Sequence, residues 1–538
     1  MKLLDLPVDI IDKIISQSLP SGFEAFALCC HAIYTRAAPK ITRHNSLKRR
    51  WRCTTIAGSK NRSDILRILC EIACDPLVGR YIKSLSLRGR GGGPNVDTKN
   101  DEFRLNEGIM ESIKNMVLKS ECFGSTEVDR QLWWEDILRE VDLDNEDGDN
   151  RDGLGAVHTT VSLLGQLPNL QTLQLPSGWY RRCRAYTVKS DAEKRAVTVL
   201  DAMVKAANDS HDQDQALGKL RIIVPSTEQG YEERAPFQVL ECFMRLKSLE
   251  ELYSTSCLAI DDGNTGIPFQ WRIPETNSNL RRIELAYCCM DEAGISVLLA
   301  HTPHLSVFRY MHECKWHGCG HDWNPGAFVE AIARHCGRTI TELTIKKHAN
   351  WGTITNGVSS LRAFAQLRML EIDLPSFCGP SVASGQRLGE DCVRPEEGEK
   401  PWTIQDIPCL GDMLPESIEG VQIDNNGWMN ERPEPEEPLE PLLRDFPEQR
   451  ALRLQNLVQL TLSGFCDGKV RALAKGAGAK TILSDRKGAF SNWPCFSTVQ
   501  KYSDLFDAAA KASNDADTRP KPVAVRRGRR TTWVYPDS

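Results

Sequence analysis

A short apolar pattern recurs along most of this chain and constrains the fold more than any other feature. It has the form apolar-x-x-apolar-x-apolar and occurs in ten copies between residues 82 and 462. The copies are Ile82/Leu85/Leu87, Leu170/Leu173/Leu175, Leu217/Leu220/Ile222, Leu249/Leu252 with Ser254 in the third place, Leu280/Ile283/Leu285, Leu305/Phe308/Tyr310, Ile340/Leu343/Ile345, Leu367/Leu370/Ile372, Ile418/Val421/Ile423 and Leu457/Leu460/Leu462. Because 41% of the residues are hydrophobic, roughly 37 such triplets arise by chance, so the context of each copy matters.

Two regularities separate these copies from chance matches. The middle copies follow one another at intervals of 25 to 35 residues, near the period of leucine-rich repeats. The first apolar residue usually follows a small or polar one, as at Asn169, Ser248, Asn279, His304, Gln366 and Asn456. Since residues two apart on a strand face the same side, each copy predicts a short strand with one apolar face.

Helical patterns stand between several of these strands. We expect helices at Asp291–His301, after the Asn324-Pro325 cap, and at Thr355–Gln366, each with one apolar face. Strands that alternate with helices predict an α/β fold, here an irregular leucine-rich-repeat-like solenoid of parallel strands over residues 81–465. An irregular α/β domain with leucine-rich strands is the alternative.

The uneven spacing also predicts large insertions and distinct ends. We expect exposed loops near 88–99 (glycine-rich), 142–153 (acidic), and 387–402 and 431–449 (rich in Glu and Pro). The remaining segments are interpreted as linking helices at 46–80, a C-terminal cap at 466–509 and a disordered tail at 510–538. The tail carries a basic cluster, Arg526-Arg527-Gly528-Arg529-Arg530, which is either a nuclear import signal or a solvated run.

The first 45 residues carry a second pattern. Apolar residues at Leu6, Ile10, Ile14 and Ile15 fall on one helical face, and Pro7 suits a first helical turn. A second helix is expected from about Glu24 to Tyr34, after a break at Gly22. So short a helical hairpin cannot bury its own apolar face, and we therefore expect it to need a partner.

These residues resemble the F-box, and in particular the F-box of fungal F-box proteins. The resemblance rests on Leu6-Pro7, Ile10, Ile14 and Cys30-x-x-x-Tyr34, and it covers only about residues 3–45. It implies docking onto a Skp-family adaptor that binds a cullin scaffold, and hence a non-catalytic substrate-recognition subunit of an SCF-type ubiquitin ligase. The predicted adaptor-binding residues are Leu6, Pro7, Ile10, Ile14, Leu28, Ile33 and Tyr34.

A leucine-rich-repeat scaffold unrelated to ubiquitin is the main alternative, with the hairpin serving as a cap on the first repeat. The exposure of Leu6 and Ile10 distinguishes the two hypotheses. A cap would bury both side chains, whereas an F-box would leave them free for the adaptor.

A third hypothesis is a zinc site in the segment from His312 to His321. Cys314, His317, Cys319 and His321 have the nitrogen and thiolate donors that zinc prefers, and His312, His335 and Cys336 lie nearby in sequence. Five potential ligands in one short loop need not converge, so the segment is interpreted first as a turn between repeats. We expect no cofactor.

Composition limits the possible function classes and the expected cellular location. The net charge of −5 does not favour nucleic-acid binding. The chain contains no run of 18 apolar residues, so the sequence predicts no membrane span. The 19 cysteines lack a disulfide framework, which predicts reduced thiols and a cytoplasmic or nuclear location. No phosphate-binding loop or nucleophile elbow is found: Ala474 and Ala479 replace the glycines that a P-loop would need before Lys480-Thr481.

Overall fold

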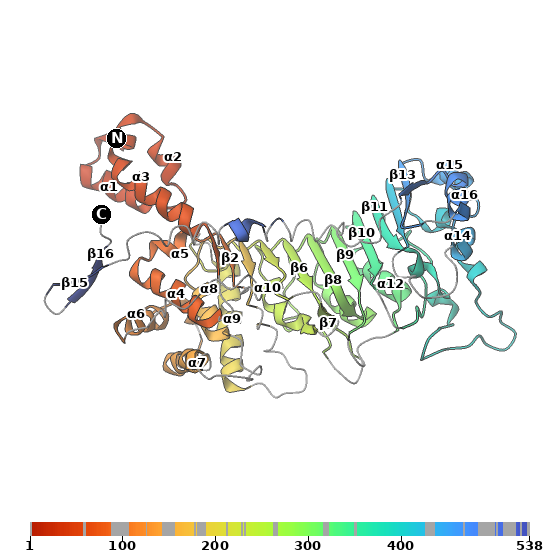
Figure 1. Ribbon diagram of the computed structural model, residues 1–538, viewed down its shortest axis with the longest axis horizontal. Coiled ribbons are helices and arrows are strands. Elements are labelled where there is room, and N and C mark those ends of the chain that lie inside the picture. The colour runs from red at the N-terminus through yellow and green to blue at the C-terminus, as the bar shows by residue number, and fades with distance from the viewer. Residues whose placement is uncertain are drawn as a thin grey trace.

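The computed structural model shows a mixed α/β protein built on one large parallel sheet (Figure 1). It describes residues 3–482 with gaps at 57–60, 88–106, 125, 143–155, 177–178, 180–189, 211–213, 228–229, 231–232, 262–266, 316–321, 349–351, 426–435 and 466–467, and beyond these residues 501, 504–508, 523–527 and 530–534. The predicted loop at 88–99 therefore lies outside the described residues, and so does the loop at 142–153 except for Asp142, which is helical.

The sheet runs the length of the molecule, and the strands along its main path follow the order of the chain. Its order is β1-β2-β3-β4-β6-β8-β9-β10-β11-β12-β13-β14, with parallel pairing throughout this path. The strands are β1 (Cys53–Thr55), β2 (Ser84–Ser86), β3 (Thr172–Gln174), β4 (Ile222–Val224), β6 (Glu251–Thr255), β8 (Arg282–Met290), β9 (Val307–His312), β10 (Glu342–Lys347), β11 (Met369–Asp373), β12 (Gly420–Asp424), β13 (Gln459–Ser463) and β14 (Lys480–Ile482). Two short strands, β5 (Ala235–Pro236) and β7 (Cys257–Ala259), extend the pairing beside β8.

The apolar pattern specifies these strands. The central residue of each copy lies opposite that of the next, as in Leu85 with Leu173, Ile283 with Phe308, and Leu343 with Leu370. The copy predicted to begin at Leu217 is wrong, because the strand pattern begins three residues later. Ile223, not Leu220, is the central residue that pairs with Leu173. Leu217 adopts a positive φ of 64° and accepts a turn hydrogen bond from the Leu220 amide, so Leu220 takes the first position of that copy.

The polar residues before the first leucine link neighbouring units. Asn169 donates from Nδ2 to the Arg80 carbonyl at 2.7 Å, and Asn279 and Asn456 make the equivalent bonds to Lys247 and Glu416 at 2.7 and 3.0 Å. Each bond satisfies a backbone carbonyl of the preceding unit, in the last turn of α5 for Arg80 and in a turn for Lys247 and Glu416.

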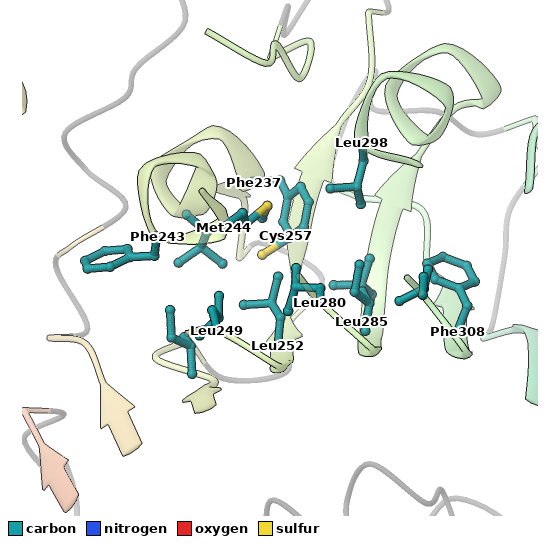
Figure 2. Packing of buried hydrophobic residues seen from close by; sticks show 14 of the residues in the cluster. Phe237, Phe243, Met244, Leu249, Leu252, Cys257, Leu280, Leu285, Leu298 and Phe308 are labelled. Carbon is teal, nitrogen blue, oxygen red and sulfur yellow. The ribbon is translucent and has the colours of Figure 1, made fainter. Parts of the chain in front are cut away.

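Helices cover one face of the sheet, and the leucines of the pattern point toward them. The helices after the N-terminal region are α4 (Asn61–Cys74), α5 (Leu77–Tyr81), α6 (Glu107–Leu118), α7 (Arg130–Asp142), α8 (Val157–Leu164), α9 (Asp191–Asp209), α10 (Glu241–Met244), α11 (Glu292–Ala300), α12 (Pro325–Cys336), α13 (Leu410–Met413), α14 (Glu436–Leu442), α15 (Phe446–Arg453) and α16 (Gly468–Gly476). Figure 2 shows Leu252 and Leu285 of the strands packed with Leu298 of α11 and Phe243 of α10. This is the main hydrophobic core.

Two of the three predicted helices are confirmed. Asp291 caps α11 by accepting from the Gly294 amide at 2.6 Å, and Asn324 caps α12 by accepting from the Ala327 amide at 2.9 Å. The helix predicted at Thr355–Gln366 is wrong. Its first residues, 355–358, are buried and lie along residues 376–380, with the Val358 amide bonded to the Ser376 carbonyl at 2.8 Å, and its remainder forms turns. A Cβ on Gly357 would lie 2.5 Å from the Phe377 carbonyl oxygen, so this close approach requires glycine.

The predicted loops and tail have mixed outcomes. Residues 387–402 are mostly exposed, as expected. The loop predicted at 431–449 is wrong from residue 436 onward, because α14 and α15 bury Leu439, Leu442 and Phe446. Within the tail predicted to be disordered, β15 (Val523–Arg527) and β16 (Arg530–Val534) form an antiparallel pair.

The N-terminal region contains three helices rather than a hairpin. They are α1 (Val8–Gln17), α2 (Phe23–Ala27) and α3 (His31–Trp51), preceded by the 3-10 turn η1 (Leu3–Asp5). The second predicted helix is broken at Cys30, whose backbone is extended, and α3 continues through Pro39. In Figure 1 these helices form a separate bundle at the β1 end of the sheet, and the last turn of α3, residues 48–51, leads into β1.

Candidate functional site

The N-terminal bundle has a buried face and an exposed apolar face. Its interior contains Ile11, Ile15 and Leu19 of the first helical segment, packed with Phe23 and Ala27. Polar contacts fix α1 on α3: Arg36 binds both carboxylate oxygens of Asp12 at 3.2 Å. The bundle therefore closes its own core, and of the seven residues predicted to bind a partner only Ile33 is fully buried in it.

Most of those predicted residues lie on the outside. Ile10 is 43% exposed, Leu28 is 73% exposed and Tyr34 is 48% exposed. Pro7 is also exposed, whereas Leu6 and Ile14 are half-buried. Six of the prediction's seven side chains are thus at least partly accessible.

Ile33 is the exception, and its assignment to the surface is wrong. It is fully buried, on the same stripe of α3 as Ala37, His44 and Trp51. These residues are spaced by four, seven and seven, which is the spacing of a single helical face. That regularity could have identified Ile33 as a core residue.

Sequence reasoning also missed three exposed residues. Leu3, Leu4 and Val8 are large, apolar and exposed beside Leu6 and Pro7. In the part of the chain that the structure describes, six of the thirteen strongly exposed large hydrophobic side chains fall within the first 34 residues. We call these six the N-terminal apolar set: Leu3, Leu4, Val8, Ile10, Leu28 and Tyr34.

A buried histidine joins the bundle to the rest of the chain. His44 of α3 contacts the Tyr81 hydroxyl through Nδ1 at 2.7 Å and the Glu24 carboxylate through Nε2 at 3.1 Å. Lys48 also binds Glu24, at 2.5 Å, and the two bonds together lower the pKa of Glu24 to about 2. The orientation of α2 is therefore set by polar contacts that leave the apolar set free.

The proposed zinc segment lies only partly within the described residues. His317, Cys319 and His321 fall outside them, while Cys314 is buried. His312 is also buried and stacks on Trp323, with ring centroids 4.6 Å apart, and His335 contacts Ser296 through Nε2 at 2.8 Å. Across the described ranges, no three His, Cys, Asp or Glu side chains are grouped so that they could hold a metal ion.

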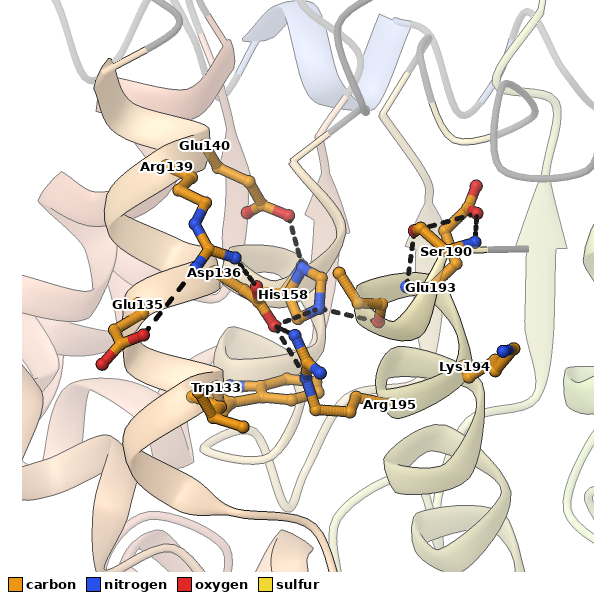
Figure 3. Close-up of polar contacts among 12 residues, drawn as sticks. Trp133, Glu135, Asp136, Arg139, Glu140, His158, Ser190, Glu193, Lys194 and Arg195 are labelled. Carbon is orange, nitrogen blue, oxygen red and sulfur yellow. Dashed lines mark hydrogen bonds and ion pairs between the residues drawn. The ribbon is translucent and has the colours of Figure 1, made fainter. Parts of the chain in front are cut away.

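A cluster of carboxylates and a histidine lies between α7, α8 and α9 (Figure 3). Glu140 accepts hydrogen bonds from the amides of His158 and Thr159, at 2.8 and 3.0 Å, so it caps the start of α8. Asp136 binds Arg139 and Arg195, at 2.8 and 2.6 Å. Each carboxylate is already occupied by a helix end or a guanidinium, so the cluster serves to hold three helices together.

The sheet face opposite the helices is polar over most of its length. On β8 and β9, Arg282 binds Glu284 at 2.8 Å, and Arg309 binds Glu342 of β10 at 2.9 Å. At the ends of β10–β12, Lys346 pairs with Glu371 and with Asp424, the latter at 2.7 Å. We call this surface the polar face; its charges are largely neutralised within the sheet itself.

The sequence matches no known family profile, and no curated protein shows significant similarity to it. Among the described helices, none combines the length and apolar character needed to cross a bilayer.

Proposed function

We propose that this chain is the substrate-recognition subunit of an SCF-type cullin ubiquitin ligase. The N-terminal bundle would bind a Skp-family adaptor, and the parallel sheet would serve as a leucine-rich-repeat-like scaffold for a protein target. The resemblance of residues 3–45 to the F-box supports the first part. The consecutive parallel strands, the recurring leucines and the asparagine bonds between units support the second.

The main structural observation that supports this proposal is the exposure of Ile10. If the bundle were a cap on the first repeat, Leu6 and Ile10 would be buried against the strands. Ile10 instead is exposed, like the rest of the N-terminal apolar set, whereas Leu6 is half-buried and packs against the core. Several exposed apolar side chains on one small helical bundle are typical of a surface that a protein partner covers.

In this proposal the chain supplies no reacting group. It holds a target lysine near a ubiquitin-carrying enzyme, and the rate rises because the effective concentration of the reactants rises. Such a protein would act in the cytoplasm, the nucleus or both.

Co-expression with a fungal Skp-family adaptor, followed by size-exclusion chromatography, tests the proposal. We expect a one-to-one complex that also recruits cullin. Burial of an Ile or Leu side chain contributes about 1.5–3 kcal/mol, so Ile10→Asp with Leu28→Asp should weaken adaptor binding by more than about a hundredfold.

Two variants of neighbouring residues serve as controls. Lys13→Glu changes the charge at an exposed position of α1 outside the apolar set and should leave adaptor binding intact. Ile11→Asp, one residue from Ile10 but buried, should unfold the bundle itself, which circular dichroism would report. Full adaptor binding by the folded Ile10→Asp/Leu28→Asp chain would refute the proposed surface.

A further inference from the structure

An apolar patch interrupts the polar face between β4 and β9. It consists of Val224, Tyr253, Ala286, Tyr287 and Met311, which form a hydrophobic cluster separate from the main core. We call it the aromatic patch. Its neighbours on the same face are the paired charges Arg282, Glu284 and Arg309, so it is an apolar island in polar surroundings.

The patch is covered by a segment from the far end of the chain. Residues 504–508 (Asp-Leu-Phe-Asp-Ala) form a helical turn, and Phe506 packs into the patch with only 4% of its surface exposed. The Cys53 thiol of β1 lies 3.8 Å from the Leu505 carbonyl oxygen. In Figure 1 this segment, coloured blue, lies near β2, at the opposite end of the sheet from β14, the last strand before it.

One side chain of this segment is buried. Leu505 is 46% exposed, and Asp504 and Ala508 are also exposed, so Phe506 is the residue of the segment that is buried. A short segment with one buried side chain can be displaced by a competitor that offers the same aromatic side chain and more contacts. Its advantage over a competitor in solution is the effective concentration that its attachment to the chain provides.

We propose that the aromatic patch is a docking site for a short protein segment with an aromatic anchor, and that residues 504–508 occupy it as an internal ligand. A partner would bind by displacing Phe506. The identification of this partner as the target of a ubiquitin ligase rests on the proposed function. The occupation of the patch by Phe506 is independent of the proposed function.

The test measures binding of a labelled synthetic peptide, residues 501–511 of this chain, to the full-length protein by fluorescence anisotropy. Phe506→Asp should open the patch and strengthen peptide binding by at least about tenfold, because the internal ligand no longer competes. Leu505→Asp, a change of the same kind at the exposed neighbour, should behave like the unaltered chain. A peptide with alanine in place of Phe506 should not bind either protein.

Equal peptide binding by the Phe506→Asp and unaltered chains, or no binding by either, would overturn the proposal. The alanine peptide tests the aromatic anchor in the peptide rather than in the protein. Its result therefore does not depend on whether a substituted protein folds. Adaptor co-purification of the Phe506→Asp chain should be unchanged, because the N-terminal apolar set lies on a different element. A failure of this inference can therefore be told apart from a failure of the proposed function.

Discussion

The N-terminal bundle and the strand region handle their apolar residues in opposite ways. In the strand region, the leucines of the pattern are buried against helices, and the other face is covered by paired charges and by Phe506. In the bundle, Ile11 and Ile15 build the core while Ile10 and Leu28 remain outside. Exposed large apolar side chains are therefore concentrated in the bundle, where six of the thirteen in the described part of the chain fall within the first 34 residues.

The same substitution in the two regions gives the largest expected contrast. Leu285→Ala removes a fully buried side chain from β8 and should lower the free energy of unfolding by about 2–5 kcal/mol. Leu28→Ala should change it by less than about 0.5 kcal/mol, since that side chain is mostly in solvent. Urea unfolding followed by tryptophan fluorescence measures both. Equal losses would mean that Leu28 belongs to the core, and the comparison would fail.

The buried charges of the polar face give the next effect. Burial opposes a charge on Lys346, but the carboxylates of Glu371 and Asp424 outweigh it and raise the pKa of the amine. Asp424→Asn removes one of these carboxylates and should lower the free energy of unfolding by about 3 kcal/mol.

Asp373→Asn is the matched control on the neighbouring strand. Burial raises the pKa of Asp373 well above its ordinary value, although Lys346 opposes the shift. The folded state thus keeps a proton that the unfolded chain releases above about pH 4, so this group lowers stability as the pH rises. Asp373→Asn should therefore be neutral or stabilising at pH 8 and should flatten the pH dependence of unfolding between pH 5 and 8. A loss as large as that of Asp424→Asn would contradict this assignment.

The cap of α8 tests how the strand region holds its helices. Glu140→Ala leaves the amides of His158 and Thr159 without their acceptor and should lower the free energy of unfolding by about 1–3 kcal/mol. Glu135→Ala removes an exposed carboxylate from the same helix, 3.7 Å from Arg139, and should have almost no effect. The midpoint of thermal unfolding should be clearly lower for Glu140→Ala than for Glu135→Ala. Equal midpoints would exclude the capping role of Glu140.

The smallest expected effect is a pH response confined to the bundle. Bonds from Lys48 and His44 lower the pKa of Glu24 to about 2, so the stability that Glu24 contributes is present above about pH 4.5 and is lost as the pH falls toward 2. Because Glu24 is half-exposed, this contribution is less than about 1 kcal/mol. Hydrogen exchange of the α2 amides should increase over that pH range, and Glu24→Gln should abolish the change. An increase of the same size in the Glu24→Gln chain would assign the response to another group.

Local patterns identified the parts of the fold that depend on a few neighbouring residues. The leucine spacing located β2, β3, β6 and β8 through β13, because alternation on a strand directly encodes which side is buried. Asp291 and Asn324 located two helix starts, since a cap needs only its own turn. The exposed positions Ile10, Leu28 and Tyr34 of the candidate site were also predicted from the sequence.

Other features were decided by residues far apart in sequence. Thr355–Gln366 has a helical pattern, but the amides of Gly357 and Val358 bond to the carbonyls of Pro380 and Ser376, and tertiary contacts override local preference. Ile10 and Ile33 are alike as residues, yet one faces solvent and the other lies beneath α1 and α2. No local signal connects Phe506 with Tyr253 and Met311. The sequence by itself determined which stretches form strands and capped helices, because periodicity is local; only the tertiary structure decided which apolar faces remain open, because burial depends on what packs against them.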